Sequence, residues 1–196
     1  MDINLFLEEL DGLYEKKQLK EVEPFFQTSL EMAKKENNLS AQFTILNEMM
    51  GFFRDTSQYE KSINACEQCI YIMKTMGIEG TVDYATSLQN IANAYRAAGL
   101  LKDSLTYYME AFRIYEKNIE AGDYRFASLN NNIALLYQEM GDFKKAVDYL
   151  EKALAIIENI EGAEIEVATT YSNLAASLLE LDRTDEAICY LEKALC

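Results

Sequence analysis

A segment of 28 residues recurs along this chain at a nearly constant spacing, and this repetition restricts the fold more than any other feature. Residues 85–112 align with residues 127–154, which in turn align with residues 168–195, at offsets of 42 and 41 residues. A further copy lies 42 residues earlier, at 43–70, and a weaker one begins near Ile3. Five copies account for nearly all of the 196 residues, so the chain is predicted to use one structural unit repeatedly.

Each copy is predicted to form a helical hairpin. Apolar residues with helical spacing run for several turns, stop at a short turn and resume. Gly99 and Gly141 stand where a first helix would end. Small residues recur where two helices must approach closely, and these are Ala92, Ala134, Ala175, Ser62, Ser104, Ala146 and Ala187. With one proline and eight glycines, the composition favours an all-α fold. The single proline, Pro24, is expected to kink a second helix slightly.

This pattern resembles the tetratricopeptide repeat, whose small, aromatic, glycine and alanine signature positions are occupied here by Ala134, Tyr137, Gly141, Phe143, Ala146 and Ala153. The repeat length of 41–42 residues is similar to that of the kinesin light chain type. In the weaker first copy, Leu10 replaces the small residue. The resemblance implies a right-handed superhelical α-solenoid of about five stacked hairpins, whose first helices line a concave groove. The expected array covers 1–196, with repeats at about 3–37, 39–79, 82–122, 124–163 and 166–196.

Composition argues against several classes of function. The chain has no histidine, which is the side chain best suited to proton transfer near neutral pH and the commonest metal ligand. Its net charge of −15 repels nucleic acid and anionic lipid surfaces. The sequence has no apolar run long enough to span a membrane and no signal peptide, so we expect a cytoplasmic protein. We expect neither enzyme activity nor a cofactor or metal.

The four cysteines are expected to be free thiols. Cys66 and Cys69 form a CxxC pair that would lie on the same side of one helix, which favours packing in the core. Redox or metal chemistry is the alternative, although no second pair of zinc ligands accompanies them. Core packing is likewise predicted for most of the tyrosines at or beside the repeat's packing positions, which are Tyr95, Tyr107, Tyr108, Tyr137 and Tyr149.

The resemblance also suggests which residues face the groove. In the family these are the second, fifth, sixth, ninth and twelfth positions of each repeat, which form one stripe along the first helix. In this sequence the stripe is rich in amides and hydroxyls. The predicted partner-binding residues are Asn47, Arg54, Gln89, Asn90, Asn93, Arg96, Asn131, Asn132, Gln138 and Asn173.

Three asparagines, Asn90, Asn132 and Asn173, hold the same position in successive copies. An asparagine amide can donate a hydrogen bond to the backbone of an extended peptide and accept one from it. Such a ladder would therefore recognise the main chain of a bound peptide. The alternative is that each asparagine bridges neighbouring hairpins. A fourth asparagine, Asn130, stands at a packing position, and nothing in the sequence explains it.

Two arginines, Arg54 and Arg96, hold equivalent positions one repeat apart in this acidic chain. They could receive an acidic group of a bound peptide, or they could pair with a nearby acid such as Asp55. Residues 84–122 carry no net charge, so the third copy is the expected centre of binding.

These features favour a non-catalytic interaction module, an adaptor that binds a protein or peptide in its groove. One alternative is a scaffold that forms a homo-oligomer through its last repeat, because the sequence stops directly after the second helix of the fifth copy, without a capping helix. Either the natural protein continues there, as it would if this chain were a fragment, or another chain covers that face. A further alternative is a peptide-sensing domain of a larger regulator of bacterial type.

Overall fold

The computed structural model describes residues 1–195, and within this range the chain is built from α-helices without a strand. The predicted all-α fold is therefore confirmed. The last residue of the fifth predicted repeat, Cys196, lies outside the described residues, as does the prediction for its thiol. In chain order the helices are α1 (Ile3–Glu15), α2 (Leu19–Lys35), α3 (Leu39–Asp55), α4 (Tyr59–Met76), α5 (Val82–Ala97), α6 (Leu101–Asn118), α7 (Tyr124–Glu139), α8 (Phe143–Ile157), α9 (Glu164–Leu179) and α10 (Thr184–Ala194).

The first helix of each repeat ends in a left-handed residue, as predicted for Gly99 and Gly141, both at φ 76°. In α7 the turn is closed by the N–H of Asp142, which donates to the carbonyl of Tyr137 at 2.9 Å, and by the N–H of Gly141. The other repeats reach the same backbone conformation without glycine, at Lys17, Ser57 and Asp182, with φ between 57° and 59°.

Helices that follow one another in a hairpin pack through small buried residues. The small residues named in the sequence analysis are all buried, at 0–1% exposure, so their predicted place in the core is confirmed. Between α3 and α4, the Ser62 hydroxyl also donates to the carbonyl of Met50 at 2.9 Å. Leu10 occupies the equivalent place in the first hairpin and is 1% exposed. A larger side chain at this place is therefore accommodated in the core.

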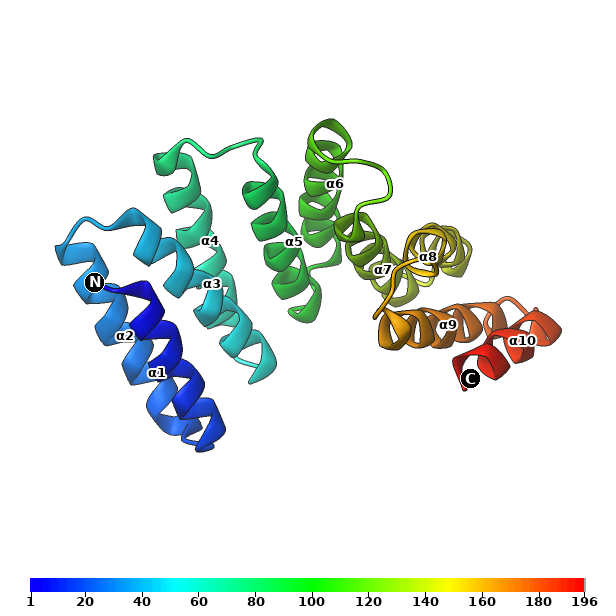
Figure 1. Cartoon of the computed structure of the whole chain (residues 1–196), viewed down its shortest axis with the longest axis horizontal. Helices are drawn as coiled ribbons and strands as arrows, with labels where there is room; N and C mark the ends of the chain where they lie inside the picture. Colours follow the sequence, from blue (N-terminus) through cyan, green and yellow to red (C-terminus); the bar gives the residue numbers. More distant parts are fainter. Residues whose placement is uncertain (196) are drawn as a thin grey trace. The chain divides into compact units, whose positions relative to one another are not determined.

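The chain divides into two compact units, residues 1–99 and residues from Leu100 onward. In the first unit, α1 packs on α2, α2 on α3, and α5 on both α3 and α4 (Figure 1). In the second unit, α7 packs on α6 and α8, and α9 packs on α8, α10 and α7. First helices of successive repeats thus adjoin one another within each unit, which places their polar stripes on neighbouring helices.

Cys66 and Cys69 are fully buried in α4, which confirms the prediction that they pack in the core. Burial, with the neighbouring Cys69, raises the pKa of the Cys66 thiol to about 12, and burial raises that of Cys69 to about 12. Cys189 is exposed on α10. Among residues 1–195, no helix is both long and apolar enough to cross a membrane.

Candidate partner-binding surface

In the first unit, the predicted stripe lies on α3 and α5 and is largely accessible. The residues at the stripe positions of α3 are all half-buried, and on α5 Asn90 is exposed while Asn93 and Arg96 are half-buried. Gln89 is the exception, because its side chain is only 9% exposed. The apolar residues between the stripe positions, such as Ile91, are buried. The stripe is therefore a polar surface laid along a packed core.

Asn47 is tied into the fold of the first unit. Its amide donates to the carbonyl of Phe43 at 3.0 Å and lies 3.6 Å from the sulfur of Cys69 on α4. This contact joins the two helices of one hairpin. The structural alternative considered for the asparagines therefore describes Asn47.

Arg54 pairs with the acid next to it in the sequence. Its Nε donates to Asp55 at 2.8 Å, and its side chain is 31% exposed. The guanidinium charge is therefore already balanced in part. An acidic ligand would have to compete with Asp55 for Arg54.

Acidic groups gather beside this arginine, on α1 and α3. Burial, and then the neighbouring Asp11, raises the pKa of Glu48, which belongs to the stripe. Burial also raises the pKa of Tyr14 to about 12, with Glu48, Asp55 and Asp11 adding to the effect. Burial is the main cause of both shifts, and the carboxylates of Asp11, Glu48 and Asp55 add a smaller electrostatic contribution around Tyr14.

In the second unit, amides of the stripe link α7 to α9. The amide of Gln138 donates to the carbonyl of Asn173 at 3.0 Å and to the hydroxyl of Ser177 at 2.7 Å. Asn131 accepts a hydrogen bond from the Thr170 hydroxyl at 3.2 Å. Neighbouring repeats are thus joined by side chains that were predicted from the sequence to bind a partner.

The asparagine ladder is not uniform in its contacts. The amide of Asn132 donates to the carbonyl of Ser128, one turn earlier on α7, at 3.1 Å. Asn132 and Asn173 are half-buried, whereas Asn90 is exposed. The three residues therefore hold equivalent positions along their helices but differ in how readily a partner could reach them.

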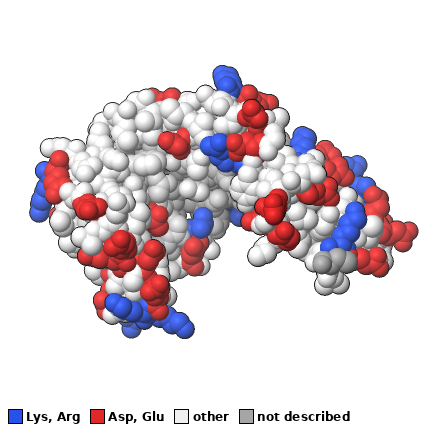
Figure 2. Space-filling view, viewed as in Figure 1, with Lys and Arg blue, Asp and Glu red and all other residues white. Residues whose placement is uncertain are grey.

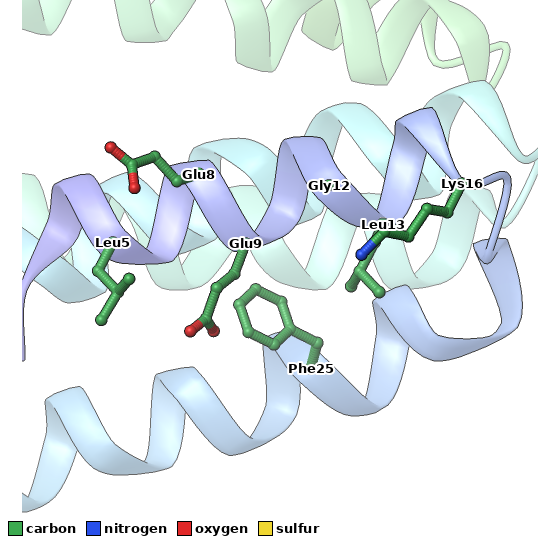
Figure 3. Close-up of a pocket in the computed structure, with 7 residues that line it drawn as sticks. All are labelled: Leu5, Glu8, Glu9, Gly12, Leu13, Lys16 and Phe25. Carbon is green, nitrogen blue, oxygen red and sulfur yellow. The ribbon is translucent and has the colours of Figure 1, made fainter.

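Two features of the surface were not foreseen from the sequence. Thr170 and Ser177, which are fully buried, were not predicted as partners of the stripe amides, although both lie one helical turn from stripe positions of α9. A hollow of about 450 Å³ also opens between α1 and α2. There Phe25 of α2 points toward α1 beside Glu9 and Leu13 (Figure 3), and Gly12 of α1 also lines the hollow.

Charged side chains are spread over both units. Figure 2 shows acidic groups over much of the visible face, with Lys and Arg side chains interspersed among them. Several of the basic residues are engaged in ion pairs, such as Lys61 with Glu23 at 2.6 Å and Arg183 with Glu186 at 2.7 Å. The acidic residues are therefore dispersed in the manner of a solvated surface.

These features define a helical repeat protein. Its hairpins share the same left-handed turn after the first helix, pack through small residues and carry a polar stripe on their first helices. The family model of the tetratricopeptide repeat matches residues 41–117 and 125–195. The chain belongs to the tetratricopeptide repeat family, as predicted. The first hairpin precedes the matched residues, in agreement with its weaker signature.

One curated relative of this chain is named for the kinesin light chain. The kinesin light chain-related protein 3 of Arabidopsis thaliana is 24% identical over 127 residues, which make up 64% of this chain and 20% of that protein. This chain thus spans about a fifth of the curated relative that it matches.

Solved structures share the fold over nearly the whole chain. BtubC (BKLC) of P. vanneervenii has a TM-score of 0.87 at 21% identity, over 98% of this chain and 78% of that one. A Podosopora anserina protein described as a kinesin light chain with nearly identical TPR-like repeats has a TM-score of 0.81 at 17% identity, over 98% and 92% of the two chains. The predicted all-α tetratricopeptide fold is confirmed by these likenesses.

Proposed function

We propose that this chain is a non-catalytic interaction module that binds a peptide or an extended segment of a partner protein along the stripe of its first helices. Tetratricopeptide repeats generally serve protein–protein interaction, and an array of this kind offers an extended surface. The observation that carries the proposal is the accessibility of the polar stripe beside a fully packed core. Of the proposed binding residues, only Gln89 is buried.

The contacts suggest which of these residues support the fold and which are available to bind a partner. Asn47, Asn131 and Gln138 already bond within the fold, so they hold the helices that present the surface. Asn90 is exposed and is the leading candidate for contact with a ligand backbone, with Asn173 as its equivalent in the second unit. The amides bond to the backbone of the partner segment, so they do not depend on its sequence. The acidic groups near Glu48 favour basic residues in that segment.

The experiment uses an array of immobilised peptides of random sequence, from which the strongest binders are resynthesised and titrated by fluorescence anisotropy. Replacing Asn90 and Asn173 by alanine together is expected to weaken binding about 30-fold, since each lost hydrogen bond contributes roughly 1 kcal/mol and the two together about 2 kcal/mol. The matched control is Asn64→Ala, which removes an exposed asparagine from the second helix α4. Equal affinities for the wild type and the double variant would refute binding through these asparagines.

A second candidate function, self-association as a scaffold, is favoured by the apolar side chains that α10 exposes. Ile188 is 49% exposed and Leu191 is 42% exposed. Apolar residues aligned on one helix face are a common basis for contact with another chain. Light scattering over a range of concentrations tests this candidate, with Leu191→Lys as the variant expected to lower the mass. A monomeric mass at high concentration would rule it out.

A further inference from the structure

A cavity of about 350 Å³ opens in the second unit between α6, α7 and α8, away from the stripe of the first helices. Its walls are mainly apolar and include Phe112 of α6, Phe126 of α7 and Ile156 of α8. Its size is at the lower end of the range of ligand pockets, so it suits a single side chain better than a folded segment.

The rings of the aromatic wall contact one another edge to face. The rings of Phe112 and Phe126 lie 5.6 Å apart at an interplanar angle of 71°, and Phe126 makes a similar edge contact with the buried Tyr115 at 5.8 Å. Rings so arranged prefer to receive a further aromatic ring against an edge or an offset face. The wall therefore offers ring edges and faces against which a flat apolar group can pack.

Asn130 supplies the polar element of the cavity. This residue lines the cavity and is only 3% exposed, and its Oδ1 is buried without a hydrogen-bond partner among the described residues. The next residue, Asn131, has the Thr170 hydroxyl as its partner. A buried acceptor without a partner is costly, and a ligand that supplies a donor would remove that cost.

The rim carries charges of both signs. Lys152 of α8 lies with its ammonium 4.8 Å from the ring centroid of Tyr149, and Glu116 of α6 is exposed. The positive charge of Lys152 and the negative charge of Glu116 offset one another. The entrance therefore does not strongly favour either an anionic or a cationic ligand. A neutral group is the best match to the cavity.

We propose that this cavity is a second binding site, which receives a tyrosine side chain of a partner protein. The phenol ring packs against Phe112, Phe126 and Ile156, and its hydroxyl meets the amide of Asn130. Tyrosine fits because a phenolic hydroxyl both donates and accepts, as does the amide. The site lies between α6, α7 and α8, and none of its lining residues belongs to the stripe, so its occupation can be tested separately from binding along the stripe.

The test compares two probes that differ by one hydroxyl, N-acetyl-tyrosinamide and N-acetyl-phenylalaninamide. Both are titrated into the full chain while the methyl signals of Ala155 and Ile156 are followed by NMR. We expect the tyrosine probe to shift these signals and to bind about fivefold more tightly, the effect of one neutral hydrogen bond. Equal affinities, or shifts confined to other parts of the chain, would overturn the proposal.

Two variants make the test specific. Asn130→Leu retains the volume but lacks the amide, so it should bind both probes equally, whereas Asn131→Leu should keep the preference for tyrosine. Ala155→Trp, an exposed position at the cavity, should block both probes. A preference that persists in Asn130→Leu would refute the role of the amide. Tighter binding of free tyrosine than of its capped amide would indicate a small-molecule site, contradicting a side chain of a partner.

Discussion

Replacing Asn130 by leucine is expected to stabilise the protein, which is the reverse of the usual effect of a substitution in a packed core. Asn130 is 3% exposed, and its neighbours Leu129 and Ile133 on α7 are fully buried. The Oδ1 atom is buried and has no partner among the described residues. The folded state therefore carries an amide acceptor that water satisfies in the unfolded state.

The size of the effect follows from that single atom. Leaving a buried acceptor unsatisfied costs about 1–3 kcal/mol, and leucine removes the acceptor while keeping a similar volume. Leucine also has a better helix propensity than asparagine, by roughly 0.5 kcal/mol. Together these contributions give an expected gain of about 1.5–3.5 kcal/mol in the free energy of unfolding. In a chain of this length, that gain raises Tm by roughly 2–4 °C per kcal/mol.

The assay is urea unfolding followed by far-UV circular dichroism, with Asn131→Leu as the matched control on the same helix. The control loses the acceptor of the Thr170 hydroxyl, which still bonds to the carbonyl of Glu166 at 2.8 Å, so a loss of about 0.5–1 kcal/mol is expected. If Asn130→Leu lowers the unfolding midpoint, as Asn131→Leu is expected to do, the amide of Asn130 has a stabilising partner and the reasoning fails.

Three further predictions concern the stripe and the thiols. Gln138→Ala should lower the free energy of unfolding by about 1–2 kcal/mol in a urea titration, because it removes two hydrogen bonds between α7 and α9; an unchanged midpoint would contradict this. Glu48→Gln should stabilise the protein at neutral pH, since the raised pKa of Glu48 means that the folded state disfavours its charge. This gain, measured as the difference in Tm from the wild type, should shrink as the pH falls through the raised pKa toward 4.5, and a gain that stays constant over this range would contradict the reasoning. In a Cys196→Ser variant, a thiol reagent should label Cys189 rapidly but should label Cys66 and Cys69 only on unfolding. Fast labelling of all three thiols would argue against the burial of Cys66 and Cys69.

The hairpins could be predicted from the sequence because their causes are local. Helical spacing of apolar residues and a glycine such as Gly141 after the first helix are readable one residue at a time. The turns at Ser57 and Asp182 have no glycine, and only their alignment with the other copies indicated them. The repeat alignment thus predicted these two turns, for which the local sequence gave no glycine signal.

The contacts of the stripe could be predicted only in part. Its accessibility follows from the helical period, which places Asn90 and Asn132 on the side away from the core. Whether an amide bonds within the fold depends on how two helices are placed in space, as for Gln138 and Ser177. The cavity beside Asn130 depends on three helices at once, so the sequence could only mark this asparagine as out of place.

The two uses of amides in the stripe also limit where a partner can bind. A ligand that recruited Gln138 would have to break its bonds to the Asn173 carbonyl and the Ser177 hydroxyl. The exchange of one hydrogen bond for another yields little net free energy, and it would loosen the contact between α7 and α9. An exposed amide such as that of Asn90 carries no such cost. Affinity should therefore come mainly from the stripe residues that the fold does not use, and the bridging amides should contribute by keeping those residues in place.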